Sequence, residues 1–95
     1  MAAYEIADVE VTDEALFDEY RKLVPATVES FGGRYIVRGG ESEVVEGNRT
    51  PHRTVIIEFP SFEQARAWHA SDEYANPKQM RIDSTNSNVM IVDGV

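Results

Sequence analysis

The chain has 95 residues, which is enough for one small domain. Its 17 acidic and 9 basic residues give a net charge of −8, which argues against a nucleic-acid binder. The lack of cysteine excludes disulfides, thiolate metal sites and cysteine nucleophiles. No apolar run approaches the roughly 18 residues of a membrane span, and no signal-peptide pattern opens the chain. We expect one acidic, cytoplasmic domain over residues 1–95, with no nucleic-acid or membrane partner.

The first half of the sequence predicts a strand followed by a helix. Residues 4–11 alternate loosely between apolar and polar and indicate a strand, after which Thr12 can cap a helix. Pro25 should bend that helix or start a second segment. Gly32 and Gly33 should end the helix, because glycine adopts the left-handed cap conformation at little cost. The apolar face of this helix comprises Phe17, Tyr20, Val24, Val28 and Phe31, at helical spacing.

The second half predicts two strands, a second helix and a last strand. The strands are expected at residues 34–38, 53–59 and 87–93, with a bulge or kink at Gly39–Gly40 and a turn at 46–48. Ser61 and Gln64 form a capping box that opens the second helix. Ser71 can end that helix and cap a further turn, and Asn76–Pro77 can restart it.

The order strand, helix, strand, strand, helix, strand indicates an α+β ferredoxin-like sandwich. Such a domain has a four-stranded antiparallel sheet with two helices on one face. Right-handed crossovers favour this topology over another α+β meander, which is the alternative.

The face of the sheet away from the helices is expected to be too apolar for water. Residues 55–57 and 89–92 are apolar throughout, where a half-exposed strand would alternate. Covering a few hundred Å² of such surface stabilises by several kcal/mol, at about 25 cal/mol per Å². We therefore expect a homodimer in which two sheets form an α/β barrel.

Charged residues on the middle strands suggest a site. If the hairpin pivots on Gly47, Arg38 and Glu58 share a face and point into the space between the two sheets, with Asp8 beside them. One interpretation is a polar pocket in which Arg38 clamps an anion and Glu58 accepts a proton. The other is an ion pair that fixes the dimer register. A cavity of about 300 Å³ or more beside Arg38 would favour the first.

Other residues carry weaker signals. His69 is either a ligand or catalytic group or a partly exposed surface histidine. Trp68 and Tyr74 are interpreted as core or dimer-rim aromatics rather than stacking platforms. The arginines are expected to pair with the acidic surplus, and this group comprises Arg34, Arg53 and Arg81. The spacing of histidines and acids matches no typical metal site, and no phosphate loop is present, so no cofactor or metal is predicted.

Several segments together resemble a known family. These are GGRYIVRGG from Gly32 to Gly40 and IIEFPSFEQARAW from Ile56 to Trp68, with Arg53 between them. The chain is similar over nearly its whole length to the DUF1330 family of small bacterial proteins of undetermined function. The matching motif positions are Arg34, Arg38, Glu58, Trp68, Tyr74 and Arg81. The sequence departs from the family at His69, where tyrosine is usual, and at Asp72, where proline is usual.

The resemblance implies the dimeric α/β-barrel superfamily, which includes cofactor-free monooxygenases, muconolactone isomerase-like enzymes and haem-degrading proteins. Because that range is wide, the fold does not select a reaction. Two functional hypotheses stay open. One is a small-molecule pocket between sheet and helices that takes an anionic or aromatic ligand, with oxygenase or isomerase activity. The other is a non-catalytic ligand-binding or protein-interaction module.

Overall fold

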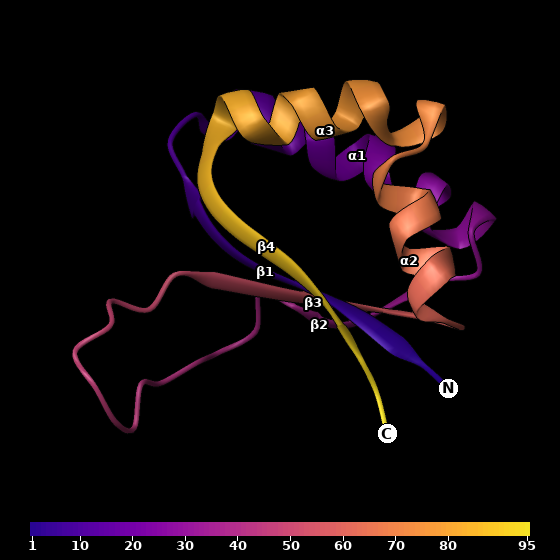
Figure 1. Cartoon of the computed structure of the whole chain (residues 1–95). Helices are drawn as coiled ribbons and strands as arrows, with labels where there is room; N and C mark the ends of the chain where they lie inside the picture. Colours follow the sequence, from indigo (N-terminus) through magenta and orange to yellow (C-terminus); the bar gives the residue numbers. More distant parts are fainter.

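A computed structural model describes all 95 residues, and the chain alternates strands and helices as βαββααβ (Figure 1). The strands are β1 (Ala3–Val11), β2 (Arg34–Arg38), β3 (Arg53–Phe59) and β4 (Thr85–Asp93). The helices are α1 (Glu14–Ser30), α2 (Phe62–His69) and α3 (Asp72–Ser84). No helix is both long and apolar enough to cross a membrane.

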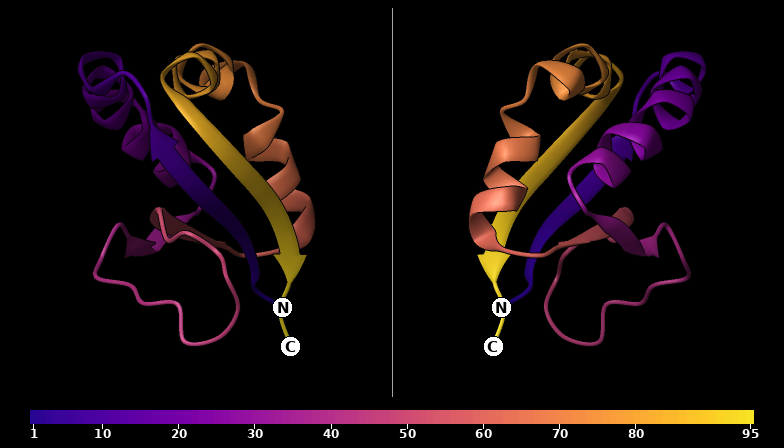
Figure 2. Two further views of the ribbon diagram at one scale, coloured as in Figure 1. Left: turned by 90° about the vertical axis from the view of Figure 1, so that its left-hand side faces the viewer. Right: turned by 90° about the vertical axis from the view of Figure 1, so that its right-hand side faces the viewer.

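The four strands form one antiparallel sheet in the order β2-β3-β1-β4. All three helices lie on the same side of it, and the side views leave the other side without a helix (Figures 1 and 2). The α+β ferredoxin-like fold is therefore confirmed. We call the two sides of the sheet the helix face and the open face.

The helical regions differ in detail from the prediction. The second region contains two helices, because Ser71 caps α3 separately after α2 has ended. Asp13, not Thr12, caps α1, and its carboxylate accepts a hydrogen bond from the Leu16 amide at 3.1 Å. Both α1 and α3 run through their internal prolines without a new start, so Pro25 and Pro77 begin no second segment.

Alternating residues of β1 explain where the core lies. Ala3, Ala7 and Val9 point to the helix face and are buried, as period-two strand geometry requires. Helix α1 contributes one apolar stripe to the same layer, and α2 contributes Trp68, which is fully buried. The core therefore occupies the layer between sheet and helices.

The pairing of β2 with β3 corrects the predicted register. A hairpin that pivots on Gly47 would pair Ile36 with Glu58 and Arg38 with Ile56. In the structure Arg34 lies opposite Glu58, and Arg38 lies opposite Val55.

A bulge inside β2 causes this change. The register shifts between Tyr35 and Val37, not at Gly39–Gly40 as expected. One extra residue reverses the side-chain alternation that follows it. Arg38 consequently belongs to the helix face, whereas Arg34 and Val37 belong to the open face.

Residues 39–52, which connect β2 to β3, form an extended arm that projects beyond the sheet (Figure 1). Part of the arm folds back over the open face, where Val44 and His52 border a hollow beside Ile6 and Asp8. The rest of the open face is uncovered in the single chain, and Met90 is 56% exposed there.

Candidate functional site

A small cavity lies on the helix face, enclosed by the sheet and by residues of α1 and α3. Its volume is about 40 Å³, room for a few water molecules and less than the 300 Å³ expected beside Arg38. Four arginines, three tyrosines and a single acid supply its polar lining, and the rest is apolar. We call it the arginine–tyrosine pocket, after Arg38, Arg53, Arg81, Tyr20, Tyr35 and Tyr74.

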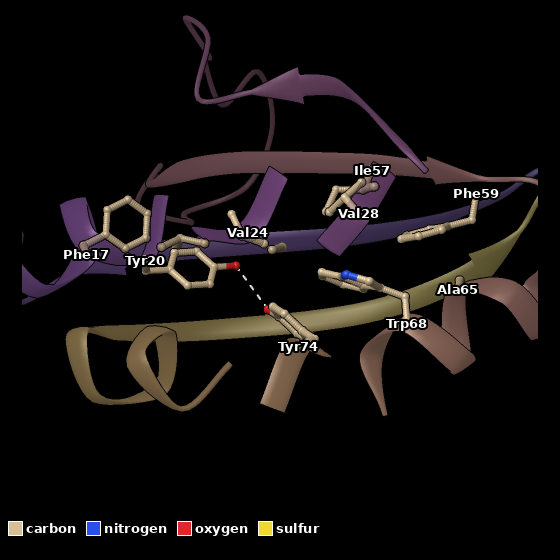
Figure 3. Packing of buried hydrophobic residues seen from close by; sticks show 11 residues of the cluster. Phe17, Tyr20, Val24, Val28, Ile57, Phe59, Ala65, Trp68 and Tyr74 are labelled. Atoms are coloured by element: carbon tan, nitrogen blue, oxygen red, sulfur yellow. Dashed lines mark hydrogen bonds between the residues drawn. The ribbon is translucent and has the colours of Figure 1, made fainter. Parts of the chain in front are cut away.

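Buried aromatic rings build one side of the pocket (Figure 3). The hydroxyls of Tyr20 and Tyr74 lie 3.1 Å apart and share a hydrogen bond. The ring of Tyr74 stacks on Trp68 with centroids 3.9 Å apart, and the Trp68 indole donates to the Thr27 hydroxyl at 3.0 Å. These contacts fix the phenol positions from two helices, α1 and α3.

Burial keeps the pocket phenols neutral. It raises the pKa of Tyr35 to about 12, and it also raises the pKa values of Tyr20 and Tyr74 above their ordinary range. All three hydroxyls therefore remain protonated at neutral pH. Because Tyr20 and Tyr74 share one hydrogen bond, Tyr35 and one member of that pair can donate to an anion.

Arg53 is the pocket cation with an unsatisfied hydrogen-bond donor. Its Nη2 donates to the carbonyl of Arg38 at 3.5 Å, but its Nε is buried without a hydrogen-bond partner. Burial lowers the pKa of Arg53, and the nearby charges of Arg21 and Arg38 lower it further. Gly39 makes room for this guanidinium, since a Cβ there would lie 2.2 Å from Nη1 of Arg53.

Arg38 and Arg81 are the other pocket arginines without a carboxylate partner, whereas the fourth, Arg21, pairs with Asp18 at 3.5 Å. The Arg38 guanidinium carbon sits 4.4 Å from the centre of the Tyr35 ring, a cation–π contact. Buried Arg81 donates from Nε to the Tyr74 hydroxyl at 3.3 Å and from Nη1 to the Ser87 hydroxyl at 2.6 Å. Its partners are therefore hydroxyls rather than carboxylates.

The expected pairing of arginines with the acidic surplus is correct for Arg34 and wrong for the pocket. Arg34 binds Glu58 at 2.8 Å on the open face. Arg38, Arg53 and Arg81 take part in none of the chain's ion pairs.

Glu5 is the one acid of the pocket, and the sequence reasoning missed it. Glu5 faces the helix side of β1 and is buried, and its Oε1 lies 2.7 Å from His69 Nδ1. A signal was present in the sequence, because Glu5 is in phase with Ala3, Ala7 and Val9. A carboxylate in the buried phase of a strand requires a partner.

The remaining predicted residues separate into two places. Asp8 and Glu58 lie on the open face, as expected, so they do not line the pocket. Asp8 there binds His52 at 3.3 Å and lies 3.9 Å from Arg49. Trp68 belongs to the core, as interpreted from the sequence. Only Arg38, Tyr74 and Arg81 of the predicted set line the pocket, with His69 bound to Glu5 at its edge.

The pocket's chemistry suits an anion. Its lining holds four guanidinium groups against one carboxylate, and three neutral phenols add donors. Apolar side chains surround these groups and lower the local dielectric, which strengthens a charge–charge contact. No group of three or more histidine, cysteine or acidic side chains in the chain is arranged to hold a metal ion.

Comparison with known proteins identifies the family. Residues 2–95 match the model of the family described as Domain of unknown function (DUF1330), and the chain belongs to that family. No curated protein matches the sequence.

Solved structures share the fold at low sequence identity. The chain is similar to the RPA0582 protein of unknown function from Rhodopseudomonas palustris, with a TM-score of 0.79 and 13% identity over 99% of this chain and 82% of that one. A dimeric ferredoxin-like protein of unknown function from Jannaschia sp. CCS1 gives 0.66 and 12%, over 99% and 100%. A protein from Nitrosomonas europaea, named as a candidate antibiotic biosynthesis monooxygenase, gives 0.57 and 12%, over 99% and 90%. At such identities the likeness establishes the fold.

Proposed function

We propose that this member of the DUF1330 family binds a small organic anion in the arginine–tyrosine pocket. The observation that carries the proposal is the set of three pocket arginines without a carboxylate partner, in a chain of net charge −8. Acids outnumber bases 17 to 9, so unpaired arginines gathered in one cavity need a reason. A bound anion would supply one, because the buried Nε of Arg53 lacks a hydrogen-bond partner, whereas the side chain of Arg38 is exposed and solvated.

Arg53 indicates where the anion sits. Its buried Nε lacks a hydrogen-bond partner, and an oxygen of a carboxylate would satisfy that donor. Arg38 lies next to it and offers a second guanidinium, so both could hold one anionic group.

The size of the pocket limits the ligand. About 40 Å³ holds an anionic head group but not a whole drug-sized molecule. A groove at the edge of α1 borders the pocket and offers about 150 Å³ more; its lining comprises two apolar residues, Val11 and Phe17, and four charged ones, Glu14, Asp18, Arg21 and Arg53. We assign the charged head to the pocket and the remainder of the ligand to this groove, where the ring of Phe17 offers an aromatic contact.

The proposal includes a homodimer. Met90 and Val92 are exposed on the open face, where Ile6 and Ile56 lie opposite each other. A second copy that packs its own open face there would cover these residues. The dimeric description of the Jannaschia protein, which shares the fold, supports this assembly.

Titration with benzoate tests the ligand class, with benzamide as its uncharged counterpart. We expect benzoate to bind and benzamide to bind at least about tenfold more weakly. Arg53→Gln should lower the affinity for benzoate by about 10–100-fold, since a hydrogen bond to a charged group contributes about 1.5–3 kcal/mol. Isothermal titration calorimetry measures all three affinities. The matched control is Arg66→Gln, an exposed arginine of α2 outside the pocket, which should bind benzoate like the wild type.

Equal affinity for benzoate and benzamide would contradict an anion site. Wild-type affinity in Arg53→Gln would move the site elsewhere.

A further inference from the structure

Glu5 and His69 form a buried carboxylate–imidazole pair at the boundary between the pocket and solvent. Glu5 lines the arginine–tyrosine pocket on one side and an open hollow on the other. His69 borders that hollow and a second one between α3 and β4, and its side chain is 33% exposed. The pair thus connects the pocket interior with water.

The placement of Glu5 is costly for a merely structural residue. Its side chain is 5% exposed, and its only hydrogen bond is the 2.7 Å contact with His69. An isolated buried charge is expensive, and a bond to one half-exposed partner offsets only part of that cost. Burial, and to a smaller extent the charge of Glu5, raises the pKa values of the pocket residues Tyr35 and Tyr74.

The other histidine shows what distinguishes this pair. His52 lies between Asp8 and Glu10 at 3.3 and 3.6 Å, also with a carboxylate partner. That cluster is on the open face under the arm, and its one arginine, Arg49, already approaches Asp8 at 3.9 Å. Only the Glu5–His69 pair adjoins unpaired arginines.

We propose that Glu5 is a catalytic proton acceptor for an organic anion held by the pocket arginines, and that His69 is the positioning residue that connects it to solvent protons. This inference rests on the proposed function. The substrate class is a small carboxylate that carries a C–H bond next to a carbonyl group, because a carboxylate base can remove such a proton when the developing oxyanion is stabilised.

The step balances without a cofactor. The C–H bond breaks and its proton moves to the Glu5 carboxylate. The electron pair left on carbon forms a C=C bond, and the carbonyl π electrons move onto oxygen, where an arginine stabilises the enolate charge. Glu5 then returns a proton to the same carbon, which gives exchange, or to another carbon of a conjugated substrate, which gives an isomer.

Deuterium exchange into phenylpyruvate tests the proposal. This probe carries a carboxylate, a carbonyl and an acidic methylene, and proton NMR in D2O follows the loss of the methylene signal. We expect the protein to accelerate exchange above the buffer rate and Glu5→Gln to lower that acceleration by about 100-fold or more, the usual size of general-base effects. His69→Gln should lower it as well, while both variants keep their affinity for benzoate within a few-fold.

Controls keep the result interpretable. His52→Gln removes the other histidine pair and should leave the exchange rate unchanged. Where Glu5→Gln fails to fold, judged by its thermal melt, Glu5→Asp and His69→Gln decide the matter, because both alter the pair without removing the buried charge.

The outcomes separate this inference from the proposed function. Benzoate binding with no acceleration of exchange, or with equal exchange in wild type and the Glu5 and His69 variants, overturns the proton-transfer role and leaves the anion site standing. Failure of both benzoate and phenylpyruvate to bind overturns the two together.

Discussion

The two faces of the sheet differ in whether their charged residues form ion pairs. On the open face the main charges are paired, as in Arg34 with Glu58 and Asp8 with His52. On the helix face Arg38 and Arg53 line a pocket without an ionic partner. Paired charges at a surface contribute little, whereas a buried donor without a partner, such as Nε of Arg53, is costly. This difference is the basis for the two proposals, assembly through the open face and ligand binding on the helix face.

The largest effect is expected from a charge on the open face. Met90→Asp would bury a carboxylate in the proposed dimer interface, and an unpaired buried charge costs about 3–5 kcal/mol. The variant should be a monomer at micromolar concentrations where the wild type is a dimer, as measured by light scattering.

Ile82→Asp is the matched control for that variant, because Ile82 of α3 is 51% exposed against 56% for Met90 but lies away from the open face. It should leave the dimer intact. Equal masses for wild type and Met90→Asp would remove the assembly role of the open face.

The second-largest effect should come from alkaline pH, which lowers stability by ionising buried tyrosines on the helix face. Because burial raises the pKa of Tyr35 to about 12, the folded state keeps a phenol proton that the unfolded chain loses near pH 10. Its contribution to stability is complete below pH 10 and is lost as the pH rises toward 12, at up to about 1.4 kcal/mol per pH unit for each such phenol. Urea midpoints between pH 8 and 11 measure the decline.

Tyr35→Phe should decline less steeply than the wild type over the same range, since it has no proton to lose there. A parallel decline in the two proteins would mean that other groups govern alkaline unfolding.

The smallest effect should be a gain in folding stability. Arg53→Met removes a buried Nε that has no hydrogen-bond partner and keeps an unbranched side chain, so we expect a small gain in stability together with loss of benzoate binding. Arg66→Met, on an exposed position, should change stability by less than about 0.5 kcal/mol. Thermal denaturation distinguishes the two, and destabilisation by Arg53→Met would mean that the cation supports the fold.

The fold could be predicted from the sequence because each element carries a local signal. The apolar stripe of α1, the Ser61 cap of α2 and the alternation of β1 specify helix and strand within short windows. The division between α2 and α3 also has a local cause, Ser71. The sequence predicts that Ser71 caps a further turn, and in the structure it caps the whole of α3.

The site could not be predicted to the same degree because it depends on contacts between distant segments. Glu5 and His69 are 64 positions apart, and only the packing of α2 on β1 brings them together. The placement of Arg38 depends on how β2 pairs with β3, which a hairpin connected by a long arm does not specify.

The bulge between Tyr35 and Val37 has an evolutionary consequence. A single-residue insertion or deletion in this short edge strand would move the guanidinium that follows it to the opposite surface. Homologues that differ there could bear arginine in the same alignment column and yet use it for different tasks. A residue's role can therefore be transferred between such homologues only when the strand pairing agrees, and identical residues at an aligned position are not enough.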